Sequence, residues 1–286
     1  DVDSAKIVSY MPHGRSGDAN AQGWYIYTYN GATWDAAGFI AENPVHNEAA
    51  NMFGPRTAMS ADGNVLAVGQ PLTPYPEKGS IRVYDISTST PTLMGTELTE
   101  TNPSTYFGMA IALNSDGTRL VAGRNLANGL DASYVYEWDP SGISGSWNQL
   151  GGPIDTPNSA GGSPNGAYDW HGYSVAISAS GDAVAFGAPT DEGNPQVPFV
   201  DVHDLVNGAW VRRPIVTRQT HDPTWGNHHY YFGSSIALSS DGNVLVVGEH
   251  KAADQGTATD QEGRAYVFSY NRDASQWFSV GTLQST

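Results

Sequence analysis

The sequence predicts an all-β chain that folds as a β-propeller made of four-stranded antiparallel blades. One observation is an internal repeat of about 50 to 60 residues, a length typical of one propeller blade. A second is a Gly-containing turn at the same place in each copy, between two apolar segments. The third is composition, because 33 Gly and 17 Pro stand beside 15 Tyr and 8 Trp, which suits many short strands joined by tight turns.

The repeat begins with an aromatic residue followed by Gly. Four copies start at successive spacings of 54, 64 and 61 residues, at Phe53, Phe107, His171 and Phe232. Inside each copy two apolar segments flank an Asp-Gly turn, or Ser180-Gly181 in the third copy, which is a strong hairpin signal. The second segment, such as Val65–Gly69, is continuously apolar, as expected for a strand buried on both faces.

Two further strands complete each predicted blade. A third strand, rich in β-branched and aromatic residues, follows a loop of variable length, for example at Gly79–Tyr84 and Gly263–Phe268. A fourth strand begins near a Trp in most copies, at Trp147, Trp210 and Trp277. Four antiparallel strands per copy, stacked radially, are typical of a propeller. The alternative is an irregular β-sandwich.

The N-terminal segment follows the same spacing. Asp3-Ser4 aligns with Asp62-Gly63, and Pro12 aligns with Pro71. We therefore expect a single domain, 1–286, of five blades, of which the first lacks its inner strand; the approximate blades are 1–42, 43–97, 98–153, 154–217 and 218–286. Natural sheets avoid an unpaired edge of this kind. Either the chain is part of a longer propeller, or another chain or a ligand supplies the missing strand.

Charge and composition exclude several classes of function. The formal net charge of −16 argues against nucleic acid and anionic membrane surfaces as partners, since both need clustered Lys and Arg. The absence of cysteine excludes disulfides, thiolate metal sites and Cys nucleophiles. No apolar stretch is long enough to span a membrane. No signal segment opens the sequence, so any targeting peptide has been removed or excluded. The location we expect is extracellular or at the cell surface, with the signal removed.

The Phe-Gly opening, the apolar strand that ends in Val68-Gly69 and the third strand at Gly79–Tyr84 together resemble the FG-GAP repeat of integrin-alpha-like propellers. The resemblance implies an extracellular adhesion or ligand-binding module, although a few such propellers are attached to hydrolases. Calcium-binding copies of that repeat carry several carboxylates in the first hairpin loop, as calcium requires. Here the equivalent loops, such as Ser60–Gly63, hold one carboxylate at most. We therefore expect plain turns and no cofactor.

The predicted strand directions place long, unlike segments on one face of the propeller: 70–78, 156–170, 190–196, 218–230 and 249–262. Long loops on a rigid scaffold are where function is usually found, so a binding site is expected on this long-loop face. The candidate ligand-binding residues are Tyr75, Trp170, His171, Asp222, Trp225, His228, His229, Tyr230 and His250. Their aromatic rings suit stacking on a sugar or gripping a peptide, although Trp and Tyr at the start of a blade are also typical packing wedges.

Histidines near acidic residues are also the raw material of a Zn or Cu site and of acid–base chemistry. The weak metal candidates are His221, His228, His229 and His250, but His228-His229 lacks the spacing that directs two imidazoles at one ion. His171 occupies the place of a Phe in the other copies, which indicates a packed variant of that aromatic residue. We therefore predict no metal site and no catalytic residue.

These observations favour a non-catalytic extracellular or surface interaction propeller, not an enzyme, which binds a protein or glycan through its long-loop face. No nucleophile elbow, phosphate loop, dinucleotide fingerprint or His-Glu-x-x-His motif is present. One alternative is a structural subunit of a larger assembly, completed at its first blade by a strand from a neighbouring subunit. Another is an enzyme that acts on polysaccharide or depends on a metal, using the His and Asp cluster around Asp222 and His228.

Overall fold

The computed structural model describes residues 5–11, 23–41, 56–71, 78–100, 106–123, 132–155, 170–189, 197–217, 231–250 and 263–284. Every regular element in these segments is a β-strand, and consecutive strands of each sheet pair antiparallel. Within these residues there is no helix of the length and hydropathy needed to cross a membrane. The predicted all-β propeller fold, with four-stranded antiparallel sheets, is confirmed.

The described strands form five sheets in chain order. The first has three strands, β1 (Lys6–Met11), β2 (Gly23–Tyr29) and β3 (Trp34–Ala41). The second has β4 (Arg56–Met59), β5 (Val65–Gln70), β6 (Ser80–Asp85) and β7 (Thr92–Leu93), and β8 (Leu98–Thr99) also pairs with β6. The third has β9 (Ile111–Leu113), β10 (Arg119–Ala122), β11 (Ala132–Asp139) and β12 (Ser146–Gln149), with β13 (Ile154–Asp155) paired to β11.

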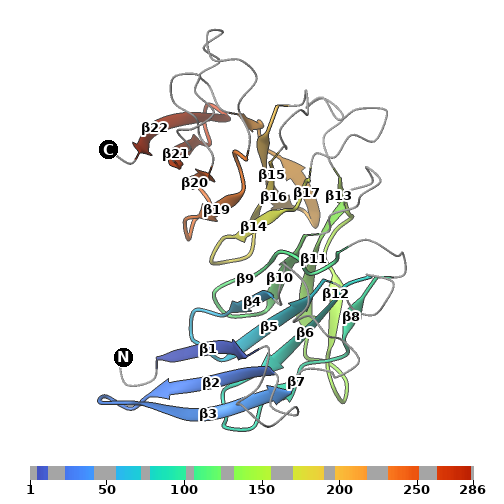
Figure 1. The fold of residues 1–286 in the computed structure, drawn as a ribbon. Coiled ribbons are helices and arrows are strands. Elements are labelled where there is room, and N and C mark those ends of the chain that lie inside the picture. Colours follow the sequence, from blue (N-terminus) through green and yellow to red (C-terminus); the bar gives the residue numbers. More distant parts are fainter. Residues whose placement is uncertain are drawn as a thin grey trace.

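The fourth sheet has β14 (Ser174–Ile177), β15 (Ala183–Ala188), β16 (Phe199–Val206) and β17 (Ala209–Arg212), with β18 (Val216–Thr217) paired to β16. The fifth has β19 (Ser235–Leu238), β20 (Val244–Glu249), β21 (Arg264–Asn271) and β22 (Gln276–Gln284). The sheets follow one another along an arc, with the first and fifth sheets at its two ends (Figure 1). Below, the forward face of a sheet is the face toward the next sheet in the chain, and the backward face is the opposite one.

The turn between the first two strands of a blade is closed by its own side chains. In the second sheet the Asp62 carboxylate accepts hydrogen bonds from the Ser60 hydroxyl at 2.6 Å and the Asn64 backbone N–H at 3.0 Å. Ser60 Oγ in turn accepts from the Val65 N–H at 2.9 Å. Gly63 has a φ of +71°, which favours glycine. The Asp-Gly signal therefore marks a turn stabilised by local hydrogen bonds, and its carboxylate is used within the turn.

Backbone hydrogen bonds join these turns from sheet to sheet. The N–H of Ala61 donates to the carbonyl of Ser115, Ser115 donates to Ala179, and Ala179 donates to Ser240, at 2.9, 3.1 and 3.0 Å. Each donor and each acceptor is the second residue of its turn, so every bond joins equivalent positions of successive sheets. We call this series the turn ladder. It fixes the register of four successive sheets at one face of the arc.

Close backbone contacts between the sheets occur at the opposite ends of the second strands. Each copy has a Gly directly after its opening aromatic residue. A Cβ atom on Gly69, Gly123 or Gly187 would overlap the carbonyl oxygen of this repeat glycine in the following sheet, which is Gly108, Gly172 or Gly233 respectively. Glycine is required here because the two backbones approach too closely for any side chain. The Gly at the end of this apolar strand therefore allows adjacent sheets to pack closely together.

The core lies between the sheets. In the interface of the second and third sheets, the forward-face residues Val65, Ala67, Ile81 and Val83 pack against Phe107, which opens the second copy of the repeat and leads into the third sheet. The backward faces contribute larger residues, as in the fifth sheet with Phe232, Tyr266 and Phe268. Small aliphatic side chains therefore face aromatic ones across each of these two interfaces.

Substitution of Gly187 by Ala tests the close contact. The added Cβ would overlap the Gly233 carbonyl, so we expect the free energy of unfolding to fall by about 1–3 kcal/mol, the usual effect of overpacking. The control is Gly152→Ala, where a Cβ meets no atom within 4 Å. That variant should change stability by less than about 0.5 kcal/mol. Urea unfolding of both variants measures the difference, and equal stabilities would contradict the assignment.

Candidate functional site

The interface between the third and fourth sheets departs from the packing pattern at three positions of the backward face. The register of β15 and β16 pairs Phe186 with Asp201 and Val184 with His203. In the fifth sheet the corresponding pairs bring aromatic residues, Tyr266 and Phe268, to these two places. The third departure is His171, which stands where Phe107 and Phe232 begin the neighbouring copies. Three positions that are aromatic in the next interface are therefore titratable here.

These residues form one buried group. His203 Nε2 lies 2.8 Å from Asp201 Oδ2, and His171 Nε2 lies 3.5 Å from the same oxygen. The guanidinium Nε of Arg212, at the end of β17, lies 3.0 Å from Asp201 Oδ1. We call His171, Asp201, His203 and Arg212 the Asp201 cluster. One carboxylate thus contacts two imidazoles and a guanidinium. His171 precedes the first strand of the fourth sheet, Asp201 and His203 lie on its third strand, β16, and Arg212 lies on its fourth strand, β17.

Burial makes this arrangement costly unless its charges are paired. His171 and Asp201 have no exposed surface, and His203 is 4% exposed. The rings pack on aromatic neighbours, since Phe186 lies 5.2 Å from His171 and 6.1 Å from His203 between ring centroids. The pairing of carboxylate with guanidinium is what allows an ionised Asp to remain in such surroundings.

The cluster also sets the protonation of Asp201. Burial by itself raises the pKa of the Asp201 carboxyl, but the interactions with His171 and His203 act in the opposite sense and dominate. The pKa of Asp201 is therefore held well below its usual range. An ionised Asp201 is the acceptor in its 2.8 Å contact with Nε2 of His203. Neither Nδ1 of His203 nor Nδ1 of His171 has a hydrogen-bond partner in the described part of the chain.

Arg212 connects the cluster to solvent and to the preceding sheet. Its side chain is 34% exposed, and a terminal guanidinium nitrogen donates to the Asp155 carbonyl of β13 at 2.9 Å. Asp201 is the third residue of β16, and two residues separate the start of β16 from the segment 190–196. The cluster therefore lies near the end of the strand from which the predicted long-loop face begins.

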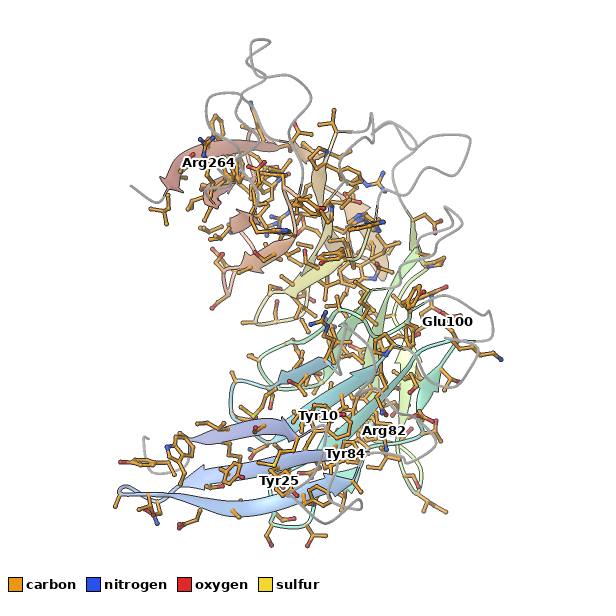
Figure 2. All side chains as sticks on the ribbon, viewed as in Figure 1. Tyr10, Tyr25, Arg82, Tyr84, Glu100 and Arg264 are labelled. Carbon is orange, nitrogen blue, oxygen red and sulfur yellow. The ribbon has the colours of Figure 1, made fainter. Side chains whose placement is uncertain are left out.

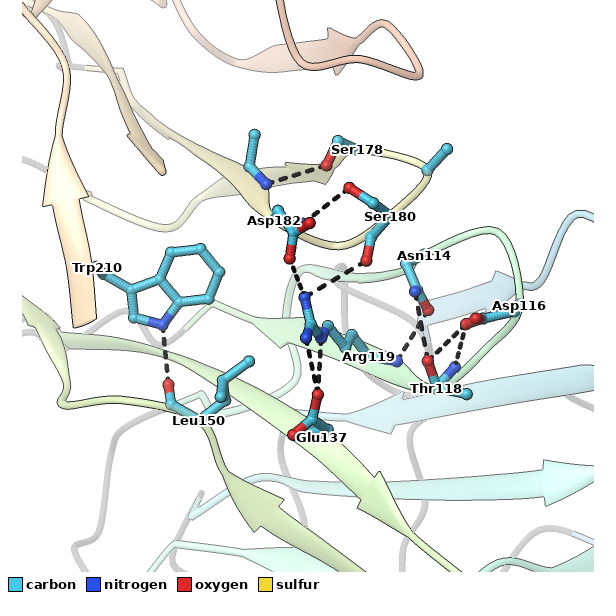
Figure 3. Close-up of polar contacts among 12 residues, drawn as sticks. Asn114, Asp116, Thr118, Arg119, Glu137, Leu150, Ser178, Ser180, Asp182 and Trp210 are labelled. Carbon is cyan, nitrogen blue, oxygen red and sulfur yellow. Dashed lines mark hydrogen bonds and ion pairs between the residues drawn. The ribbon is translucent and has the colours of Figure 1, made fainter. Parts of the chain in front are cut away.

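Polar contacts on the hairpin side brace the same interface. Arg119 of β10 pairs with Glu137 of its own sheet at 2.8 Å and with Asp182 of the next sheet (Figure 3). Trp210 of β17 donates its indole N–H to the Leu150 carbonyl at 2.8 Å (Figure 3). These bonds join the third and fourth sheets, so the geometry of this interface does not depend on the cluster alone.

Three of the predicted ligand-binding residues fall in the described segments. His171 is fully buried in the Asp201 cluster. Trp170 has a φ of +48° and stacks on Tyr173, with ring centroids 5.6 Å apart. Tyr106 and Tyr231 share this left-handed backbone immediately before their own Phe-Gly pairs, so Trp170 occupies a recurring turn. Tyr75, His221, Asp222, Trp225, His228, His229 and Tyr230 lie outside the described residues.

His250 lies apart from the Asp201 cluster, at the end of β20 in the fifth sheet. Its Nδ1 is 3.1 Å from the hydroxyl oxygen of Ser234, and its ring packs on Tyr231 at 4.4 Å between centroids. An imidazole beside a hydroxyl is the minimal arrangement of nucleophilic catalysis. Among the described residues no group of three or more His, Cys, Asp or Glu side chains is arranged to hold a metal ion.

The sequence reading missed Asp201, His203 and Arg212. The signal was present in β16, where Phe199-Val200-Asp201-Val202-His203 places two titratable residues on one face of an apolar segment. Comparison of that alternation with Tyr266 and Phe268 of the last copy would have found Asp201 and His203. The contact between His171 and Asp201, which lie thirty residues apart in sequence, arises only when the residues before β14 pack against β16, and the sequence alone does not show this packing.

Comparison with known proteins identifies the repeat. The FG-GAP repeat family matches residues 226–268, which confirms the predicted resemblance in the last copy. No curated protein matches the chain in sequence. The chain is similar in structure to a candidate 6-phosphogluconolactonase from Bacteroides fragilis, with a TM-score of 0.56, 11% identity, and coverage of 98% of this chain and 67% of that one. It is also similar to the periplasmic gluconolactonase of Pseudomonas aeruginosa, with a TM-score of 0.57, 16% identity, and coverage of 97% and 68%.

These structures correct the functional prediction. The sequence favoured a non-catalytic interaction propeller and no enzyme, and both predictions are wrong, because the similar propellers are described as gluconolactonases. The prediction failed because it took the absence of familiar catalytic motifs as evidence. A propeller can assemble a catalytic group from side chains of several strands, which leaves no contiguous motif.

Asp201→Asn tests the electrostatics of the cluster. The pKa of Asp201 is lowered on folding from its ordinary value of about 3.9, so its ionised form stabilises the fold above about pH 4. This contribution is lost as the pH falls below about 4. We expect Asp201→Asn to lower the free energy of unfolding at pH 7 by about 3–5 kcal/mol, the usual effect of breaking a buried pair.

Denaturant unfolding of wild type and Asp201→Asn between pH 7 and pH 3 measures this difference. The gap between the two proteins should narrow below about pH 4, as Asp201 of the wild type begins to protonate. Asp182→Asn is the control, because it removes an exposed partner of Arg119 at the same interface and should cost less than about 1 kcal/mol. A gap that is the same at pH 3 and pH 7 would show that the Asp201 carboxylate does not carry the effect.

Proposed function

We propose that this propeller is a hydrolase of cyclic esters, a lactonase, and that the Asp201 cluster is its catalytic group. The observation that carries the proposal is the replacement of three packed aromatic positions by His171, Asp201 and His203 in one interface of a repeating scaffold. Departures from an otherwise consistent pattern are expected at functional sites. A buried group with a strongly perturbed pKa and a specific charge partner is a further mark of such a site.

The geometry suits general-base catalysis. Asp201 holds His203 through Nε2, so Nδ1 is the atom that accepts a proton from water. The activated water attacks the lactone carbonyl carbon and forms a C–O bond. The ring C–O bond then breaks, and the ring oxygen takes up the proton to give the hydroxy acid. The carboxylate orients the imidazole and stabilises its charged form, as in other carboxylate–histidine pairs.

Arg212 supplies the positive charge that this reaction needs. Negative charge develops on the carbonyl oxygen during attack, and a fixed cation in a water-poor site stabilises it more than water does. Arg212 is the most exposed member of the cluster, so the substrate is expected to approach from its side. The net charge of −16 disfavours a strongly anionic substrate, so a neutral sugar lactone is favoured over its phosphorylated form.

A location outside the cytoplasm belongs to the same proposal. The similar gluconolactonase of Pseudomonas aeruginosa is described as periplasmic, which supports an equivalent placement for this chain. Its complete lack of cysteine is compatible with an oxidising compartment, because no thiol is present to be oxidised. Detection of the protein after fractionation of its source cells checks the placement.

Hydrolysis of gluconolactone, 6-phosphogluconolactone and a simple γ-lactone by the purified chain tests the function, with acid release followed in a pH-stat. We expect turnover, with gluconolactone preferred over its phosphate. Asp201→Asn and His203→Gln should each lower kcat/KM by about 10²–10⁴-fold, the usual contribution of a general base. No turnover of any lactone would overturn the proposal.

Two further variants separate the catalytic group from its surroundings. Asp182→Asn disturbs the same interface without touching the cluster, and it should retain the wild-type rate. Ser234→Ala removes the hydroxyl beside His250 in the neighbouring interface. If Ser234→Ala abolishes turnover while folded Asp201→Asn retains it, the catalytic group is the Ser234–His250 pair and the assignment to Asp201 is wrong.

A further inference from the structure

Two turns of the described chain carry the same tripeptide in different surroundings. Asn30-Gly31-Ala32 lies between β2 and β3 in the first sheet, and Asn207-Gly208-Ala209 lies at the turn from β16 to β17 in the fourth. Tyr25 marks β2 in Figure 2, and Figure 1 shows β2 and β16 in separate parts of the arc. The two turns therefore allow one chemical sequence to be compared in two structures. Two more Asn-Gly pairs, at Asn128 and Asn165, lie outside the described residues.

An Asn side chain that precedes Gly is able to react with the backbone, because no side chain on the Gly blocks the approach. The backbone nitrogen of the Gly attacks Cγ of the Asn, so a new C–N bond forms and the Cγ–Nδ2 bond breaks. The attacking nitrogen gives its proton to solvent base, and the leaving amide takes a proton from water and departs as ammonia. Water then opens the five-membered imide at one of its two carbonyl carbons, which gives aspartate or isoaspartate. The reaction needs a free amide, an accessible nitrogen and a turn that is able to move.

The Asn207 turn meets these conditions. Asn207 and Gly208 are exposed, with φ values of +51° and +80°, and two left-handed residues in a row are typical of a type I′ hairpin turn. Neither the Asn207 side chain nor the Gly208 N–H makes a hydrogen bond in the part of the chain that the structure describes. A Cβ on Gly208 would meet no atom within 4 Å, so the peptide between the two residues has room to rotate. The strand pair that closes the turn, Val206 with Ala209, is also exposed.

The Asn30 turn holds its amide in place. Asn30 Oδ1 accepts the backbone N–H groups of Ala32 at 2.9 Å and of Thr33 at 2.8 Å. Asn30 Nδ2 donates to the Thr33 hydroxyl at 3.0 Å and to a carboxylate oxygen of Asp35 at 2.6 Å. The amide must leave these partners before Cγ is able to meet the Gly31 nitrogen, and each lost hydrogen bond adds to the barrier. The same tripeptide is therefore fixed in the first sheet and free in the fourth.

We propose that Asn207 is a site of spontaneous covalent modification, at which the folded protein loses ammonia and gains a carboxylate. Each event adds one negative charge to a chain whose formal net charge is −16. Isoaspartate also lengthens the main chain in the turn between β16 and β17. Arg213 binds the two carboxylate oxygens of Asp204 at 2.8 and 2.6 Å and so holds the rest of this hairpin in register. The change is thereby confined to the turn, and the modified protein stays folded.

Incubation of the folded protein in water enriched in heavy oxygen, at mildly alkaline pH, measures the reaction. Opening of the imide incorporates one heavy oxygen atom, so peptide mapping by mass spectrometry separates these events from those that occur later, during digestion in ordinary water. We expect Asn207 to react at least about tenfold faster than Asn30, the factor that one or two hydrogen bonds supply. In urea, where the chain is unfolded, the two Asn residues should react at similar rates, because the same two residues follow each of them.

Variants assign the difference to the hydrogen bonds. Asp35→Ala removes an acceptor of the Asn30 amide, so it should raise the rate at Asn30 and leave the rate at Asn207 unchanged. Asn207→Gln should abolish the reaction in this turn, because the longer side chain forms the corresponding six-membered ring far more slowly. Circular dichroism before and after incubation should show the same fold. Equal rates at Asn30 and Asn207 in the folded protein, or reaction at Asn30 alone, would overturn the proposal.

Discussion

The contact of backbone with backbone between successive sheets is the constraint on which the rest of this structure depends. At Gly69, Gly123 and Gly187 the second strand of one sheet touches the repeat glycine of the next, with no room for a side chain. The turn ladder fixes the same sheets at the opposite ends of these strands. With both ends of the contact set by backbone, the side chains between them must fill a gap of nearly constant width. Small forward residues meet aromatic backward ones in this gap between the second and third sheets and between the fourth and fifth.

The same backbone contacts explain how the Asp201 cluster fits between two sheets. The gap between the third and fourth sheets is set by Gly123 with Gly172 and by the Ser115–Ala179 hydrogen bond, whichever side chains fill it. Titratable groups can therefore replace aromatic ones without moving the sheets, provided that their charges are paired. Asp201 meets this condition through His203 and Arg212. Each junction between sheets thus buries a layer of side chains, and the chemistry of that layer can differ from one junction to the next.

The fold could be predicted from sequence because its determinants are local. The Asp-Gly turn, the apolar strand and the aromatic-Gly entry each act within a few residues, and their recurrence revealed the blade. The site could not be predicted in the same way, since His171 and Asp201 meet only through the packing of a blade entry on β16. The one predicted residue found in the cluster, His171, was interpreted as a packed aromatic substitute. The full burial of His171 fits that interpretation, but its contact with the Asp201 carboxylate does not. The other predicted residues of the loop at 221–230 stay predictions, because they lie outside the described segments.

The backbone contacts between sheets have a consequence for local opening. Among the described residues the sheets contact one another in chain order, as the units of a repeat protein do, so stability is approximately a sum over junctions. The third and fourth sheets are each held by backbone contacts on both sides, at Gly69 with Gly108, Gly123 with Gly172 and Gly187 with Gly233. Opening either sheet breaks two junctions at once, which makes local opening there costly. The Asp201 cluster lies between these two sheets, so its geometry is held from both sides.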